Sequence, residues 1–186
     1  MTPANASMIS AQARQSLVRV LHRAVQSRLV LQPGDPCTIT ELATHMPDSA
    51  ADDVIVVLTI SSMGFRYMLF LRFPDDATTA DYFARGNAND LRDALLELGN
   101  LCCGAINQDL GRHFPDLGMS TPYVLGGHAL RHVDSLKPDF RADFDVAIGT
   151  SVAVGVTMCM FTRVPVDFQV GHEVEEDTSD GELELF

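Results

Sequence analysis

The chain contains no stretch of eighteen or more apolar residues, the length that a membrane-spanning helix needs. Its first residues are not a basic start followed by an apolar run, so a secretory leader is not indicated. The four cysteines include no Cys-x-x-Cys pair, which argues against a zinc site and against a disulfide framework. We therefore expect a cytoplasmic protein in which thiols such as those of Cys102 and Cys103 pack as small apolar groups.

Positive charge is also scarce. The 186 residues include 13 Lys and Arg against 25 Asp and Glu, for a formal net charge of −12. Such a surface repels polyanions, which excludes nucleic acid and an anionic membrane as main partners. The bases are unevenly distributed, because residues 1–31 hold four arginines and no acid. These arginines are Arg14, Arg19, Arg23 and Arg28.

The opposite imbalance marks the other end of the sequence, where residues 171–186 hold seven acids and no Lys or Arg. We interpret residues 1–170 as one domain, because 46% hydrophobic content suffices for a core. Residues 171–186 are expected to be a disordered, solubilising tail. The alternative is a docking motif that ends in Leu183, Leu185 and Phe186.

Two regions near the start of the chain contain residues that typically begin or end a helix. Residues 9–31 lack Pro and Gly and place Leu17 and Leu21 on one side with Arg23 opposite, which predicts an amphipathic helix. Pro33 and the residues after it end that helix. Residues 38–41 resemble a capping box that opens a short helix through Met46, although an irregular connection fits equally well.

Strand patterns dominate the rest of the chain. Residues 54–60 are rich in β-branched side chains and residues 65–73 alternate, which predicts an antiparallel hairpin. Residues 143–148 and 151–162 predict a second hairpin, with a turn at Gly149 and Thr150. Between the hairpins we expect a short helix over 75–85, a helix that Asn89 or Asp90 caps and that runs to about Gln108, and a strand near 122–132.

This order of elements indicates the fold class. Each half of the chain contributes one long helix and one strand pair, so a pseudo-duplicated unit is plausible. Antiparallel hairpins with helices on one face suit a two-layer domain better than a parallel crossover fold. We predict an α/β protein of the α+β two-layer type, with a mainly antiparallel sheet and long helices packed on it.

The helix from about residue 90 carries an unusual polar stripe. Asp93, Glu97, Asn100 and Gly104 follow one another at offsets of four, three and four residues. At about 100° per residue they fall within an arc of roughly 60° on the helix. The opposite side is apolar and consists of Leu91, Leu95, Leu98, Cys102 and Ala105. Burial of that side would point the stripe towards water or another molecule.

The stripe is part of a longer pattern. An acid, three residues, Glu97, two residues and Asn100 are followed, after twenty-one further residues, by Pro122. Ser120 and Thr121 precede this proline, and Gly126 and Gly127 come after it. From about residue 54 to 161, this pattern and the order of elements resemble the CheC/CheX/FliY family of chemotaxis phosphatases. The resemblance implies a CheC-like fold.

The same resemblance implies an activity. The protein would be a hydrolase that removes the phosphoryl group from the aspartyl phosphate of a CheY-like response-regulator receiver. Glu97 and Asn100 would be the catalytic pair, with Glu97 docking on the receiver's lysine and Asn100 orienting the attacking water. Asp93, Gly104 and Pro122 would contact the partner. The receiver would supply Mg²⁺, so the protein would need no cofactor of its own.

The first half of the chain determines how many Glu-x-x-Asn sites the protein can have. Residues 9–31 contain neither Glu nor Asn, so a second Glu-x-x-Asn site cannot form there. One active helix makes the chain resemble CheX more than the two-site CheC. CheX-like proteins form dimers, and a homodimer is inferred from this resemblance alone.

Each residue of the pattern also has an ordinary structural interpretation. Asn100 can be a polar helix residue, Asp93 part of a capping box, Gly104 a tolerated helix glycine and Pro122 the start of an edge strand. At the level of the protein, the alternatives are a non-catalytic adaptor and a flagellar-switch scaffold. The histidines provide no metal site, because His128 and His132 share a face without an acid at matching spacing.

Overall fold

The computed structural model describes residues 8–45, 50–87 and 89–171. The acidic tail after Gly171 and the predicted helix end at Met46 lie outside these residues. The elements in chain order are α1 (Ala11–Leu29), β1 (Cys37–Glu41), β2 (Val54–Ser61), β3 (Phe65–Phe73), α2 (Ala77–Ala84), α3 (Leu91–Gly111), β4 (Gly118–Met119), β5 (Tyr123–Gly126), the 3-10 helix η1 (Gly127–Leu136), β6 (Phe140–Ile148) and β7 (Val152–Thr162).

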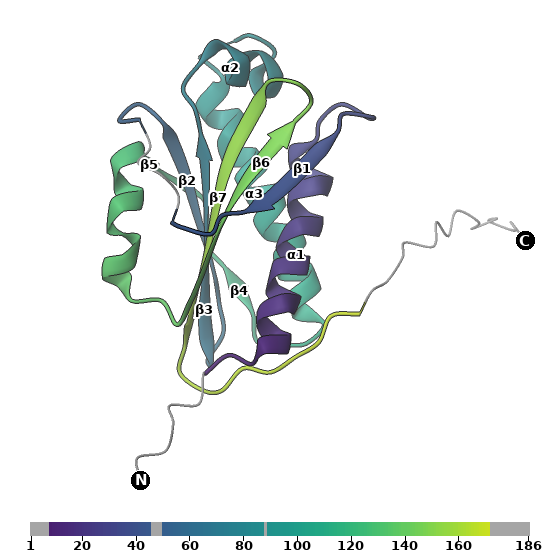
Figure 1. Ribbon diagram of the computed structural model, residues 1–186, viewed down its shortest axis with the longest axis vertical. Coiled ribbons are helices and arrows are strands. Elements are labelled where there is room, and N and C mark those ends of the chain that lie inside the picture. Colours follow the sequence, from purple (N-terminus) through teal and green to yellow (C-terminus); the bar gives the residue numbers. More distant parts are fainter. Residues whose placement is uncertain (1–7, 46–49, 88, 172–186) are drawn as a thin grey trace, which may run out of the picture.

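One seven-stranded sheet organises the chain (Figure 1). Its order is β1-β6-β7-β3-β2, and β4 and β5 both pair with β2 at the far edge. The pairs are antiparallel, and both predicted hairpins, β2–β3 and β6–β7, are confirmed. The two hairpins meet in the middle, where β3 pairs with β7.

The sheet order shows the pseudo-duplication. Each half supplies one long helix, one edge strand and one hairpin: α1, β1 and β2–β3, then α3, β5 and β6–β7. The edge strands are exchanged, because β1 pairs with the second half's β6 and β5 pairs with the first half's β2. The predicted α+β class is therefore confirmed, and the duplication is visible in the pairing although the sequence contains no usable repeat.

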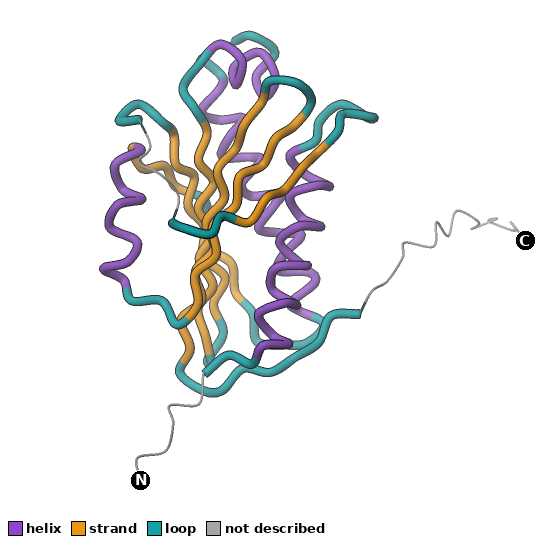
Figure 2. Tube along the Cα trace, in the orientation of Figure 1, coloured by secondary structure: helices purple, strands orange, loops and turns teal. Residues whose placement is uncertain are grey.

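The two long helices lie side by side on one face of the sheet (Figure 2). The α1 helix begins where the Ser10 side chain accepts a hydrogen bond from the backbone N–H of Ala13, which is the usual N-cap arrangement. Its apolar side packs into the main core, and Leu17 and Leu21 are fully buried. The amphipathic helix predicted from residues 9–31 is confirmed, with its end before Pro33.

The predicted capping box at residues 38–41 is wrong, since these residues form strand β1. The edge of β6 is open on this side, and β1 pairs with it from Cys37 opposite Ile148 to Glu41 opposite Phe144. The β-branched Thr38, Ile39 and Thr40 suit this pairing better than a helix. The local sequence is compatible with a helix start, but pairing with the distant strand β6 stabilises the extended conformation instead.

The predicted strand at 122–132 is too long. The strand β5 ends at Gly126, and η1 follows. Leu130 and Val133, three residues apart, bury themselves against Ile55, Val57 and their neighbours on the sheet face that α1 and α3 leave open. Spacing by three is the periodicity of a 3-10 helix, so burial of these two side chains favours η1 over an extended strand. The expectation that helices cover only one face was therefore incomplete (Figure 2).

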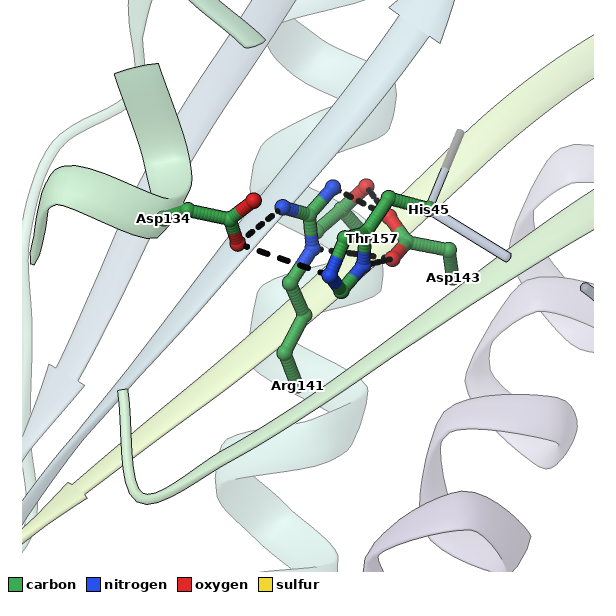
Figure 3. Close-up of polar contacts among 5 residues, drawn as sticks. All are labelled: His45, Asp134, Arg141, Asp143 and Thr157. Carbon is green, nitrogen blue, oxygen red and sulfur yellow. Dashed lines mark hydrogen bonds and ion pairs between the residues drawn. The ribbon is translucent and has the colours of Figure 1, made fainter. Parts of the chain in front are cut away.

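A polar cluster centred on the buried side chains of Arg141, Asp143 and Thr157 links the elements on this second face (Figure 3). The carboxylate of Asp143 on β6 accepts hydrogen bonds from Arg141 Nε at 2.8 Å and Arg141 Nη2 at 3.0 Å, and from the hydroxyl of Thr157. Arg141 Nη1 also donates to Asp134 on η1 at 2.7 Å, and His45 Nδ1 lies 3.2 Å from Asp143. The cluster thus joins β6, β7, η1 and the loop after β1.

Sequence analysis missed this cluster. In β6 the apolar side chains of Phe144, Val146 and Ile148 alternate with polar ones, which is typical of a strand with one face in water. The structure instead covers part of that face, so that the side chains of Arg141 and Asp143 are only 7% and 3% exposed. Burial of charge is stable here because each charge has a partner.

Candidate functional site

The α3 helix positions the polar stripe. Its apolar side is buried as predicted, with Leu95 and Cys102 fully inaccessible and Leu91 and Leu98 nearly so, while Ala105 is half-buried. Asp90 stands at the N-cap position, as expected, but its side chain makes no capping hydrogen bond, and its carboxylate instead accepts a hydrogen bond from Asn87.

Gly99 sets the depth of α3 on the sheet. A Cβ atom at this position would lie 2.6 Å from Val56 Cγ1 and 3.1 Å from Leu58 Cδ1, both on β2. The absence of a side chain therefore allows the helix backbone to approach the strand closely. Because Asn100 is the next residue, this close approach also fixes where its carboxamide stands relative to the sheet.

The outward side of α3 carries the four predicted residues. Asp93 and Glu97 are exposed, and Asn100 and Gly104 are half-buried. Within the part of the chain that the structure describes, the side chains of Asp93, Glu97 and Asn100 make no hydrogen bond or ion pair. Their carboxylates and carboxamide are therefore available to a second molecule.

Two further features of this surface favour contact with another protein. A Cβ atom added at Gly104 would meet nothing within 4 Å, so the fold itself does not require glycine there. Leu101 is 43% exposed and follows Asn100 directly. Sequence analysis did not single out Leu101, whose exposure adds an apolar contact point beside Glu97 and Asn100.

The segment around Pro122 lies at the sheet edge beside β2. Ser120 exchanges two hydrogen bonds with Thr59, its N–H donating to the Thr59 carbonyl at 2.9 Å and its Oγ accepting from the Thr59 N–H at 3.0 Å. Pro122 is half-buried and stands immediately before β5. The neighbouring strand β4 contacts α3, so the segment before Pro122 lies near this helix.

The other parts of the pattern have structural causes. A Cβ at Gly127 would lie 1.9 Å from the Ala50 carbonyl oxygen, so this glycine is required where η1 begins.

The two adjacent cysteines of α3 are buried. Burial raises the pKa of Cys102 and of Cys103 to about 12, which keeps both thiols protonated and unreactive at neutral pH. Their packing as small apolar groups is confirmed.

Over 8–45, 50–87 and 89–171, no group of three or more His, Cys, Asp or Glu side chains is arranged to hold a metal ion. None of the helices in these ranges has the length and apolar character needed to cross a bilayer.

Comparison with known proteins identifies the fold. Neither protein-family models nor curated proteins give a match. Among solved structures, CheX of Borrelia burgdorferi, in its complex with CheY, BeF₃ and Mg²⁺, aligns with a TM-score of 0.58 at 9% identity over 80% of this chain and 97% of its own. The chain has a CheC-like fold.

Other CheC-like structures agree. A CheC-like superfamily protein from Shewanella sp. PV-4 aligns with a TM-score of 0.52 at 13% identity, over 81% of this chain and 98% of its own. CheX of Desulfovibrio desulfuricans also gives 0.52, at 14% identity over 78% and 97%. At identities this low, the structural alignments establish a shared fold and no more. The chemistry must be argued from the residues on α3.

Proposed function

We propose that this CheC-like protein is a phosphatase that hydrolyses the aspartyl phosphate of a CheY-like receiver. The observation that carries the proposal is the position of Glu97 and Asn100, one helical turn apart on the outward side of α3, with no partner for either side chain among the described residues. A buried and hydrogen-bonded Asn100 would have argued against it.

The reaction needs little from the phosphatase. An aspartyl phosphate is an activated acyl phosphate, so hydrolysis requires a water molecule in line with the phosphorus and stabilisation of the developing charge. The receiver supplies Mg²⁺ and a lysine for the second task. The phosphatase therefore has to place one polar group beside the water and to hold the two proteins in register.

The residues on α3 suit these tasks. The carboxamide of Asn100 carries both a donor and an acceptor and is neutral, so it can approach the anionic phosphoryl group where a carboxylate would be repelled. Glu97 would pair with the receiver's lysine and orient the helix. Asp93 would assist this docking, Gly104 would let the receiver backbone approach, and Pro122 would border the contact.

The solved complex of Borrelia burgdorferi CheX with CheY supports a receiver as the partner, because a protein of the same fold binds one. By the same resemblance we propose that the protein is a homodimer, which sedimentation of the purified chain would test. A cytoplasmic location follows from the proposed partner.

The test is decay of a phosphorylated receiver with and without the protein. Wild type should accelerate the decay, and Asn100→Ala should lower this activity on the order of 10²-fold or more while binding of the receiver is retained. Glu97→Ala should weaken binding, or binding and rate together. Asn89→Ala is the matched control, since it removes the same carboxamide from an exposed position just before α3.

The proposal fails if wild-type protein leaves the decay of every receiver from the same genome unchanged. Retention of full activity in Asn100→Ala would exclude the proposed role of the carboxamide and would leave a different residue to be found. Equal losses in Asn100→Ala and Asn89→Ala would point to a general effect on the helix.

A further inference from the structure

A pocket of 470 Å³ lies beside α1, where the helix borders the β1–β6 edge of the sheet. Its floor is partly apolar, with Val18 and Phe140, and its polar walls include Arg14, Arg19 and Glu41. The lining contains two arginines and one glutamate, so it is basic on balance in a chain whose net charge is −12. It plays no part in the proposed phosphatase chemistry on α3.

Because the fold is duplicated, α1 in the first half can be aligned with α3 in the second half. When the buried positions of α1 are aligned with those of α3, six pairs coincide. These pairs are Ala13 with Leu95, Ser16 with Leu98, Leu17 with Gly99, Val20 with Cys102, Leu21 with Cys103 and Ala24 with Ile106.

In this alignment, residues that line the pocket occupy the positions of the polar stripe. It pairs Gln15 with Glu97, Val18 with Asn100 and His22 with Gly104. The pocket is therefore the first half's counterpart of the α3 surface. Its catalytic groups are missing, as the sequence predicted.

The charge of this counterpart surface differs from that of the stripe. By the same alignment the acids of α3 are replaced by uncharged residues, Asp93 by Ala11 and Glu97 by Gln15. The basic groups in the pocket wall, Arg14 and Arg19, align with Leu96 and Leu101. His22 also lines the pocket, with its Nε2 atom buried behind the surface and without a hydrogen-bond partner among the described residues. The pocket wall therefore lacks the two acids of the stripe and carries two arginines, which are the side chains that bind carboxylates most strongly.

An acidic segment of the chain begins beside this pocket. The residues before it run along α1, where Val170 donates its N–H to Ser16 Oγ at 3.0 Å and accepts a hydrogen bond from Arg19 Nη1 at 2.8 Å. Residues 172–186 follow at once, and they contain seven acids and no Lys or Arg. Arg19 is therefore both a wall of the pocket and the anchor of the chain that leads into the segment.

We propose that residues 172–186 bind in the α1 pocket as an intramolecular ligand. Their carboxylates pair with Arg14 and Arg19, and their apolar side chains rest on Val18 and Phe140. The tether makes this binding efficient, because a short linker gives an effective concentration in the millimolar range. About four extended residues span roughly 13 Å, so the first acids of the segment lie within reach of the anchor at Arg19.

The experiment uses the full chain with Cys37→Ser and Ser179→Cys, so that a nitroxide label reports the position of the acidic segment. The other three cysteines are buried and stay unlabelled. We expect the label to broaden backbone amide signals of residues 14–22 and of Glu41 more than those of residues 93–104. The effect should fall as salt rises from about 0.05 M to about 0.5 M, because screening weakens exposed ion pairs.

A matched pair of variants tests the site. Gln15→Glu adds a negative charge to the pocket wall and should reduce the ratio of bound to unbound segment roughly two- to fivefold. Gln26→Glu adds the same charge to an exposed position farther along α1 and should change the ratio little. Equal effects of the two changes would overturn the assignment of this pocket.

Two other outcomes would also overturn the proposal. One is broadening without preference for the α1 pocket or centred on α3. The other is broadening that appears only between molecules, in a mixture of labelled chain and isotope-enriched unlabelled chain. Neither readout depends on receiver dephosphorylation, so this inference and the proposed function stand or fall separately.

Discussion

Gly99 and Gly104 lie five residues apart on α3, and replacement by alanine should stabilise the protein only at Gly104. At Gly99 the new methyl group would be 2.6 Å from Val56 Cγ1, whereas at Gly104 it would meet nothing within 4 Å. Val56 is fully buried in the central part of β2, and a β-branched side chain has few alternative rotamers in a strand. The clash therefore has to be relieved by movement of α3 away from the sheet.

The magnitudes follow from these contacts. In a helix interior, alanine is favoured over glycine by about 0.5–1 kcal/mol. Gly104→Ala should gain this amount. Gly99→Ala gains the same contribution from propensity but has the overpacking penalty of about 1–3 kcal/mol, so it should be neutral to destabilising by about 2 kcal/mol. The two variants should therefore differ by about 1–3 kcal/mol in the free energy of unfolding.

Urea denaturation followed by far-ultraviolet circular dichroism measures the difference, with the slope of the transition checking that both variants unfold like wild type. Equal stabilities would show that Val56 yields without cost and that close helix–strand packing does not explain Gly99. Receiver decay provides a second readout. If the receiver approaches Gly104, Gly104→Ala should lose phosphatase activity although it is the more stable protein.

Three further predictions concern other parts of the molecule. Arg141→Ala leaves the buried Asp143 carboxylate without its main partner and should lower the free energy of unfolding by about 3–5 kcal/mol, while Arg141→Met with Asp143→Leu should restore part of it in the same urea assay. Burial lowers the pKa of His22 below its ordinary 6.5, against an opposing effect of Glu41, so protonation favours the unfolded chain. Wild type should thus lose more stability than His22→Gln as the pH falls from about 6.5 towards the lowered pKa of the folded state, and equal losses would show that His22 is not the responsible group. Cys37 is half-buried and the other three cysteines are buried, so a thiol reagent at pH 8 should label Cys37 first and the rest only after unfolding; burial raises the pKa of Cys159 to about 12, as it does for Cys102 and Cys103.

Sequence periodicity predicted most of the fold because the elements concerned are amphipathic by themselves. The α1 and α3 helices and both hairpins each contain one apolar side that only one regular structure can bury, so their type was readable from 3.6-residue or two-residue spacing. The errors at residues 38–41 and 127–132 have another origin. These short segments have ambiguous local preferences, and the partner surface decided between helix and strand.

The candidate site divides in the same way. The sequence alone determined that Asp93, Glu97, Asn100 and Gly104 share one side of a helix, because offsets of three and four residues suffice for that. Only the tertiary structure decided that this side faces outward without partners among the described residues, and that the packing of α3 on the sheet requires glycine at position 99. It also brought together Arg141, Asp143, Asp134, His45 and Thr157. The physical reason is range: helical and strand spacing acts over a few residues, whereas burial and ion pairing depend on segments that meet only when the sheet has formed.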